Sequence, residues 1–205
     1  MELLLIFCKN PVPGKVKTRL AKTIGIQDAT AVYEQLCTHT RKVATQWGGT
    51  VAVWHAHGIP PHNPWKVLGP FQFEQQGDDL GQRMAHAFRW GFKQGYQKIT
   101  IIGSDLWTLT SEDLTKAFAA MDTHSVVWGP AADGGYYLLG LTQMQEVLFE
   151  NLLWSQPKLL ETSQKRIPSE TQYLLRQQND IDTLEDLAAH PNGAAFLSST
   201  LPKKQ

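Results

Sequence analysis

Two short apolar runs constrain the fold of this chain more than any other feature of its sequence. Residues 3–7 are all apolar and residues 99–102 are mostly β-branched, and neither run alternates between apolar and polar positions. A strand with this pattern is buried on both faces, as in a parallel sheet covered by helices on each side. The two runs therefore predict an α/β fold.

The rest of the pattern alternates between predicted helices and strands, which favours a mainly parallel sheet. Residues 136–141 follow a tight turn at Asp133-Gly-Gly and are expected to return as an antiparallel strand. Further strands are predicted at residues 50–55, 71–74, 125–128 and 173–176, and helices at about 27–47, 79–94, 110 onward, 143–150, 157–165 and 183 onward. We expect one three-layer α/β/α domain over residues 1–190 with a mixed sheet, followed by a polar tail over residues 191–205.

Composition excludes several classes of protein. The 205 residues carry 19 basic and 19 acidic side chains, so a broad positive surface for nucleic acid is not predicted. Cys8 and Cys37 fit neither a zinc spacing nor a disulfide framework, and we expect both to be reduced core thiols. The sequence has no recognisable signal peptide and no apolar run near the roughly 18 residues of a membrane span. A cytoplasmic protein is the resulting expectation.

The loop after the first strand carries basic residues that suit phosphate binding. Residues 9–19 contain three lysines and one arginine, with two prolines and a glycine that prevent regular structure. Backbone amides of a glycine-containing turn, together with Lys15, Lys17 and Arg19, can surround a phosphate. The spacing matches neither a P-loop nor a dinucleotide fingerprint. A phosphate site is predicted here, and a solvated basic loop is the alternative.

Four aspartates follow predicted strands or turns, where a carboxylate is held on a rigid element. Asp105 comes just after the strand at residues 99–102, at the edge of the sheet where α/β proteins bind ligands. Asp180 and Asp182 alternate and share one face of an extended segment, so one of them can join Asp105 around Mg²⁺ or Mn²⁺. The alternatives are a helix cap for Asp105, a residue that only precedes the Thr183 cap for Asp182, and a turn residue for Asp133.

Five segments together resemble a known family. They are residues 7–20, 76–84, 103–106, 129–140 and 180–183, and they span nearly the whole chain in one order. The set resembles the DUF2064 family of small bacterial proteins, which are usually called glycosyltransferases and are linked to arsenosugar-type biosynthesis. The resemblance implies a GT-A fold, also called the nucleotide-diphospho-sugar transferase fold. Molybdenum-cofactor nucleotidyltransferases and phosphoenolpyruvate or lactyl-phosphate guanylyltransferases belong to the same superfamily.

The resemblance also implies roles for particular residues. In these relatives the first loop grips phosphates, the Gly-Asp-Leu-Gly segment lies by the nucleotide, and an acid after the central strand binds the metal. The implied metal ligands here are Asp105 and either Asp180 or Asp182. The candidate nucleotide- and substrate-binding residues are Lys9, Gly14, Lys15, Thr18, Gly77, Asp79, Leu80, Gly81, Arg83, Ser104, Gly134, Gly135 and Tyr136.

One position departs from the family pattern. The family usually has proline after Gly-Ser-Asp-Leu, whereas this chain has Trp107. A tryptophan leaves the turn freer than proline would and can reach toward a ligand. Trp65, Trp107 and Trp154 lie in predicted loops and are candidates for stacking on a base or sugar, whereas the other tryptophans are expected to pack inside the protein.

The function expected from these features is transfer of a sugar from a nucleotide-diphosphate sugar to a small-molecule acceptor, with Mg²⁺ or Mn²⁺ as cofactor. Lys15, Lys17 and Arg19 would neutralise the diphosphate, and Asp133 would be an acceptor-side base or hydroxyl anchor. A nucleotidyltransferase that joins an NTP to a phosphorylated small molecule is the second hypothesis, and a non-catalytic nucleotide-binding protein is the third. Neither nucleic acid nor a membrane is an expected partner, and a homodimer is compatible with the sequence.

Overall fold

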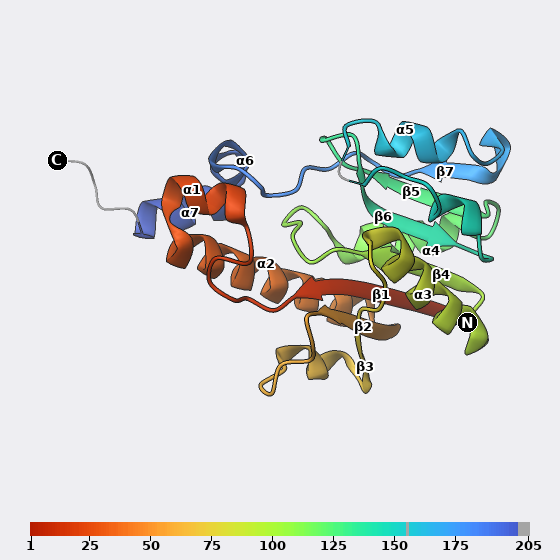
Figure 1. The fold of residues 1–205 in the computed structure, drawn as a ribbon, viewed down its shortest axis with the longest axis horizontal. Helices are drawn as coiled ribbons and strands as arrows, with labels where there is room; N and C mark the ends of the chain where they lie inside the picture. The colour runs from red at the N-terminus through yellow and green to blue at the C-terminus, as the bar shows by residue number, and fades with distance from the viewer. Residues whose placement is uncertain (155, 201–205) are drawn as a thin grey trace.

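The strands form one mixed sheet in the computed structural model, which describes residues 1–154 and 156–200 (Figure 1). Within these residues the strand order is β3-β2-β1-β4-β6-β5-β7. Among the strands in the described residues, only β6 runs antiparallel to its neighbours, as predicted from the turn before it. The strand bounds are β1 Glu2–Lys9, β2 Thr50–Ala56, β3 Phe71–Glu74, β4 Lys98–Ile102, β5 Val126–Pro130, β6 Tyr136–Leu141 and β7 Gln172–Leu174.

The apolar run in β1 is buried on both faces, which confirms the prediction of a central strand. Leu4 and Ile6 pack with side chains of α2 (Ile26–Trp47) and α4 (Ser111–Ala120) on one face. Leu3 and Leu5 pack on the other face against α3 (Leu80–Lys93). Each of these leucines is fully buried, and truncation of such a side chain to alanine typically costs about 2–5 kcal/mol. This two-sided core fixes the sheet edge on which the loops gather.

Local capping sets several helix boundaries where the sequence placed them. α2 ends at Gly48, which adopts a left-handed conformation with φ of 79°. Asp79 caps α3 by accepting the Gln82 N–H at 2.8 Å. Reciprocal capping boxes begin α4 at Thr110 and α6 (Leu184–Ala189) at Thr183. Shorter elements are α5 Leu159–Gln164 and the 3₁₀ turns Pro64–Leu68, Glu146–Leu148 and Ser169–Thr171.

Two helices were not predicted from the sequence. Residues Thr18–Ile24 form α1 instead of continuing the basic loop, and Pro191–Thr200 form α7 where a polar tail was expected. Both belong to a third apolar cluster, in which Leu20 and Phe196 are buried with residues of α2 and α6. Figure 1 shows α1, α6 and α7 grouped beside the start of α2, at the end of the molecule opposite the N-terminus. Long-range packing, which local pattern does not reveal, stabilises both helices. Residues 201–205 of the expected tail lie outside the described residues.

The described helices include none that is both long and apolar enough to cross a bilayer. The longest helix, α2, carries charged side chains along one side, and its buried residues lie on the other side, facing the sheet and α1. This pattern is typical of a helix that packs on a sheet with one side and is exposed on the other.

Candidate active site

A cavity of about 550 Å³ opens at the carboxyl ends of β1, β2 and β4. These parallel strands end at the same edge of the sheet, so the loops that follow them surround one space. The cavity is lined by Phe7, Cys8, Lys9, Val16, Lys17, Thr18, Arg19, Tyr33, Ala56, His57, Gln75, Leu80, Arg83, Gly103, Ser104, Asp105 and Asp182. Its volume is in the range of sites that bind small molecules and cofactors.

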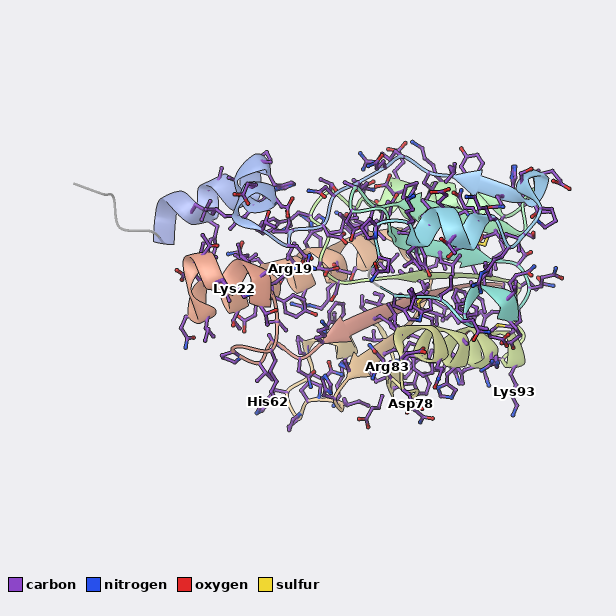
Figure 2. The ribbon with its side chains drawn as sticks, turned by 45° about the horizontal axis from the view of Figure 1, so that its top comes forward. Arg19, Lys22, His62, Asp78, Arg83 and Lys93 are labelled. Atoms are coloured by element: carbon purple, nitrogen blue, oxygen red, sulfur yellow. The ribbon has the colours of Figure 1, made fainter. Side chains whose placement is uncertain are left out.

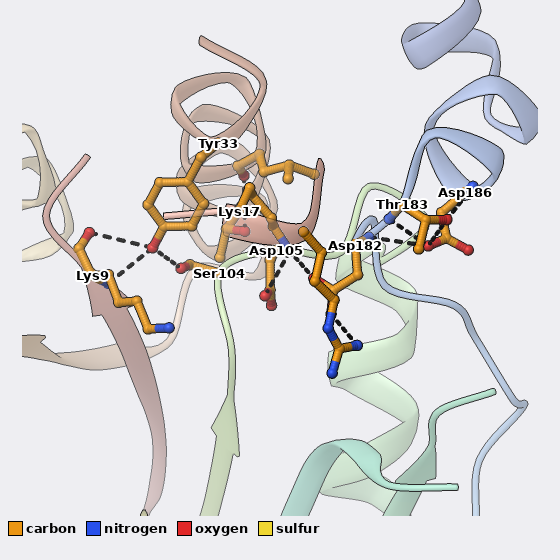
Figure 3. A network of polar contacts seen from close by, with 11 residues as sticks. Lys9, Lys17, Tyr33, Ser104, Asp105, Asp182, Thr183 and Asp186 are labelled. Atoms are coloured by element: carbon orange, nitrogen blue, oxygen red, sulfur yellow. Dashed lines mark hydrogen bonds and ion pairs between the residues drawn. The ribbon is translucent and has the colours of Figure 1, made fainter. Parts of the chain in front are cut away.

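Lys17 bridges two of the predicted acids on one side of this cavity (Figure 3). Its Nζ lies 3.0 Å from Oδ2 of Asp105 and 2.9 Å from Oδ1 of Asp182. The Lys17 side chain is only 4% exposed, whereas those of Asp105 and Asp182 are 38% and 46% exposed. Two segments that are far apart in the sequence are therefore joined at the cavity by one buried cation.

Burial and charge oppose each other at this bridge. Burial alone would lower the pKa of Lys17, but the charges and hydrogen bonds of Asp105 and Asp182 outweigh it and raise that pKa. Asp180 lies in an adjoining hollow of about 80 Å³ that Asp105 also lines. Burial, followed by the negative charge of Asp105, raises the pKa of Asp180, although Lys17 opposes the shift. Asp105 and Asp182 thus place two carboxylates around the single ammonium of Lys17, and the raised pKa of Asp180 favours its neutral form beside them.

The backbone holds the acidic segment in place. The Ile181 N–H reaches the Asp105 carbonyl oxygen at 3.5 Å, at the limit of a hydrogen bond. Asp186 accepts the N–H groups of Asp182 at 3.1 Å and Thr183 at 2.8 Å. Burial would raise the pKa of Asp186, but these hydrogen bonds and those from the side chains of Thr183 and Asn179 lower it. The cap of α6 therefore also orients the segment that carries Asp182.

Tyr33 forms part of the cavity floor, and the sequence analysis did not select it. Its Oη accepts the N–H of Lys9 at 2.8 Å and lies 2.8 Å from Oγ of Ser104 (Figure 3). Burial raises the pKa of Tyr33, so the phenol stays neutral. A residue of α2 thereby joins the ends of β1 and β4. Helical periodicity assigns Tyr33 only to the core, so no sequence signal pointed to this contact.

The predicted basic residues divide into two groups. Lys9, Lys17 and Arg19 line the cavity, and Arg83 joins them from α3. Arg19 is 74% exposed and its Nη1 lies 3.7 Å from Oδ2 of Asp182. Figure 2 labels Arg19 on α1 and Arg83 on α3, which are separate elements of the fold. Lys15 is exposed and, like Gly14 with φ of 78°, belongs to a turn outside the cavity lining.

The predicted segment at residues 77–83 contributes both lining and structural residues. Leu80 and Arg83 line the cavity, and Arg83 Nε donates to the Gly77 carbonyl at 2.9 Å. Gly77 has φ of 136°, which few other residues adopt. At Gly81 a Cβ would lie 2.3 Å from the Trp154 ring, so glycine there permits packing. Asp79 is the cap of α3.

The turn at Asp133 lies near the acids but makes a different set of contacts. Asp133 is exposed, and its Oδ1 accepts the Gly135 N–H at 2.9 Å, as in a turn that an aspartate stabilises. Its charge is among those that raise the pKa of Asp180, so it lies within electrostatic reach. A Cβ on Gly134 would lie 1.7 Å from the Pro157 carbonyl oxygen. Tyr136 lines the small hollow beside Asp180 and packs edge-on against Trp128.

The donor set suits a hard cation, although its side chains are now arranged around Lys17. Among residues 1–154 and 156–200, no three His, Cys, Asp or Glu side chains are grouped as metal ligands. Asp105 and Asp182 nevertheless converge on one cation, with Asp180 beside Asp105. Carboxylate oxygens are the protein ligands that Mg²⁺ and Mn²⁺ prefer. The Lys17 ammonium marks a position where these oxygens stabilise positive charge.

Trp107 does not reach toward the cavity, which corrects one expectation. It is 5% exposed, lies in the third apolar cluster, and stacks on His190 with ring centres 5.3 Å apart. Trp65 is also buried and lies under the guanidinium of Arg41. Trp154 packs against the core beside Gly81. The tryptophans in loops therefore fill apolar space that local sequence does not reveal.

The two cysteines are free and buried, as expected. Burial raises the pKa of both thiols, to about 11 for Cys37. A thiol with a raised pKa is a poor nucleophile at neutral pH. Cys8 lines the cavity as a neutral group. Its Sγ is 3.5 Å from Nδ1 of His55. Burial lowers the pKa of His55 below its ordinary value.

Comparison with solved structures places the fold among transferases that act on nucleotides. A structure from Desulfovibrio desulfuricans G20, described as a "putative nucleotide-diphospho-sugar transferase", is 28% identical with a TM-score of 0.84, covering 97% of this chain and 94% of that one. The inositol-1-phosphate CTP transferase of T. maritima is 12% identical with a TM-score of 0.57, over 97% and 95% of the two chains. A CMP:2-keto-3-deoxy-manno-octonic acid synthetase complexed with CTP is 13% identical with a TM-score of 0.54, over 97% and 99%.

These similarities agree with the fold and with the class of enzyme that the sequence predicted. At 12–13% identity the last two structures show the shared fold alone. No curated protein matched the sequence. A family model described as "Uncharacterized protein conserved in bacteria (DUF2064)" matches residues 39–156, which is more than half of the 205 residues. The chain therefore belongs to the DUF2064 family, as its five motifs indicated.

Proposed function

We propose that this protein is a metal-dependent glycosyltransferase that takes a sugar from a nucleotide-diphosphate sugar and transfers it to a small-molecule acceptor. One observation carries the proposal: Lys9, Lys17, Arg19 and Arg83 line the same cavity as Asp105 and Asp182. Cations and carboxylates in one cavity suit a diphosphate bound together with a divalent ion. The 28% identity with a structure described as a nucleotide-diphospho-sugar transferase supports the choice of donor.

The chain's own residues would act on the leaving diphosphate. Arg19 and Arg83 reach the cavity from different helices and would hold the phosphates from two sides. Asp105 and Asp182, with Asp180 nearby, would hold Mg²⁺ or Mn²⁺, which when bound supplies Lewis-acid stabilisation of the charge on the diphosphate. Asp133, which is exposed and whose charge acts on Asp180, is the candidate base that takes the proton of the acceptor hydroxyl.

A nucleotidyltransferase is the second candidate. There a phosphorylated acceptor attacks the α-phosphate of an NTP, and pyrophosphate leaves. The concentration of basic side chains in the cavity favours this reaction because a triphosphate carries more negative charge than a diphosphate sugar. The structural likeness to a protein described as a CTP transferase and to a synthetase complexed with CTP is compatible with it.

Ligand stabilisation separates the two candidates. Melting temperatures would be measured with NTPs, NDPs and NDP-sugars, each with and without Mg²⁺ or Mn²⁺, since tighter binding raises stability more. The glycosyltransferase predicts the largest shift with one NDP-sugar and metal. A shift with an NTP and none with any NDP-sugar would identify the nucleotidyltransferase instead. Release of NDP or of pyrophosphate from the best ligand then reports which bond is broken.

A further inference from the structure

We propose that Lys17 is an internal gate, an ammonium that occupies Asp105 and Asp182 until the phosphates of a nucleotide draw it away and open these carboxylates to a divalent ion. The inference rests on the proposed function, because it concerns the metal and phosphates of that same site. It adds a dependence of metal binding on nucleotide binding, which the donor set alone does not imply.

The first argument is that the lysine occupies one oxygen atom of each of the two carboxylates that would hold a metal. Lys17 Nζ lies 3.0 Å from Asp105 Oδ2 and 2.9 Å from Asp182 Oδ1, the two exposed acids of the candidate metal set. An oxygen that accepts a charged hydrogen bond at this distance has its charge engaged by the ammonium. A divalent ion that entered beside Lys17 would also be repelled by it.

The second argument is that Lys17 has another set of partners within reach. It lines the cavity together with Lys9, Arg19 and Arg83, where phosphates are expected to bind. A polyphosphate there brings several anionic oxygens to the ammonium, which can then exchange carboxylates for phosphates. Asp105 and Asp182 lose their bridging ammonium in this exchange, although Arg19 lies 3.7 Å from Asp182 Oδ2, and Asp180 remains beside Asp105. Two neighbouring carboxylates without their lysine attract a divalent ion strongly.

The third argument is the local backbone. Lys17 has φ of 45° and ψ of 45°, a left-handed conformation that residues with a side chain seldom adopt. It precedes the first residue of α1, where a change of φ and ψ redirects the side chain without moving a strand. Its present conformation aims the ammonium at the two acids, so the ion pairs offset the strain. Loss of those ion pairs to phosphate removes the reason for this conformation, which favours a second position of the side chain.

The gate predicts that metal and nucleotide bind cooperatively, and linkage requires the effect to be reciprocal. Mn²⁺ binding would be measured by electron paramagnetic resonance and by calorimetry with Mn²⁺ alone. We expect Lys17→Met to bind Mn²⁺ at least tenfold more tightly than the parent, because the competing ammonium is gone. Arg19→Met is the charge-matched control. It removes one cation near Asp182, but Arg19, unlike Lys17, does not bridge the two acids. Its affinity for Mn²⁺ should rise less than threefold.

Equal gains in the two variants would attribute the effect to net charge and overturn the gate. The gate would also be overturned if the parent, without nucleotide, bound Mn²⁺ as tightly as Lys17→Met does. In that case the proposed metal-dependent function would stand. If neither the parent with any of the four common nucleoside diphosphates nor Lys17→Met binds Mn²⁺, the metal-dependent function itself fails. Should Lys17→Met not fold, Lys17→Gln, which is neutral but retains a donor, must show the same gain in Mn²⁺ affinity.

Discussion

Two ion-pair networks in this protein use the same types of residue but bury opposite partners. In the first, which joins α4 to the segment after β7, the acid Asp113 is 6% exposed at its side chain and its cation Arg176 is 55% exposed. In the second, at the cavity, the cation Lys17 is 4% exposed and the acids Asp105 and Asp182 are far more exposed. In the first network the buried partner is the anion, whereas in the second the anions are the partners exposed at the cavity.

The two networks also differ in how completely their charges are compensated. Both Asp113 oxygens accept from Arg176 at 2.8 Å, and Oδ2 also accepts from the N–H and hydroxyl of Thr110 and from Gln178. Burial alone would raise the pKa of Asp113, but these donors lower it. At the cavity the shift goes the other way for Asp180, whose pKa is raised. The first network is complete and stabilises the fold, whereas the second leaves two carboxylates on one ammonium and can still take up a cation.

The largest expected effect is a loss of catalytic activity when an acid of the second network is changed. Asp105→Asn should lower turnover of the best nucleotide sugar by about 10³-fold, which corresponds to about 4 kcal/mol of transition-state stabilisation. The reason is that Asp105 is a proposed ligand of the ion that stabilises the leaving diphosphate. Release of the nucleoside diphosphate would be measured under saturating Mn²⁺. The melting temperature should stay near that of the parent, and a variant with parental turnover would remove Asp105 from the metal site.

The next effect is on stability and belongs to the first network. Asp113→Ala should reduce the free energy of unfolding by about 3 kcal/mol, because it leaves buried donors of Thr110 and Gln178 without their acceptor. Urea denaturation measures the loss. Mn²⁺ and nucleotide affinities of the folded fraction should match those of the parent. If ligand affinity fell tenfold, the two networks would be coupled and their comparison as separate units would be wrong.

Much of the sheet and its capped helices could be predicted because their signals are local. The apolar runs in β1 and β4 and the capping boxes at Thr110 and Thr183 each lie within a few residues of sequence. α1 and α7 escaped prediction because each is stabilised by distant partners. Leu20 and Phe196 are buried only when α2 and α6 lie beside them. The prediction that Trp107 reaches a ligand was wrong for the same reason, because the residues that bury it, His190 and the third cluster, are distant in sequence.

The candidate site divides in the same way. Carboxylates at strand ends are recognisable because parallel strands bring their carboxyl ends to one edge, and the structure does bring Asp105 and Asp182 together. Which group lies between them could not be read from spacing, since Lys17 was assigned to phosphate and no pattern relates it to residues 88 and 165 positions away. Tyr33 was missed because a buried aromatic in a helix has the same sequence pattern whether or not its hydroxyl forms part of a site.

A smaller effect tests the first network through pH. Arg176→Met should cost about 2 kcal/mol at pH 7, the scale of hydrogen bonds to a charged group. In the parent the lowered pKa of Asp113 gives stability that is complete above the unfolded pKa, near 3.9, and is lost as pH falls through the folded pKa. Without Arg176 the folded pKa rises, so the variant loses less on acidification. The stability difference should narrow between pH 7 and pH 3, and a constant difference would mean that Arg176 acts by packing alone.

The smallest effect compares the two capping boxes, which are matched in chemistry. Thr110→Ala and Thr183→Ala each remove a hydroxyl that accepts the N–H of the third helical residue at 3.2 Å, and each should cost about 1 kcal/mol. Thr183 is next to Asp182, and Asp186 binds both of their N–H groups, so only Thr183→Ala disturbs the direction of an acid at the cavity. Calorimetry should show Mn²⁺ affinity lowered about threefold by Thr183→Ala and unchanged by Thr110→Ala. Equal affinities in the two variants would mean that the Lys17 ion pair and the Asp105 backbone orient Asp182 without help from the cap. The second network would then consist only of the side chains that face the cavity.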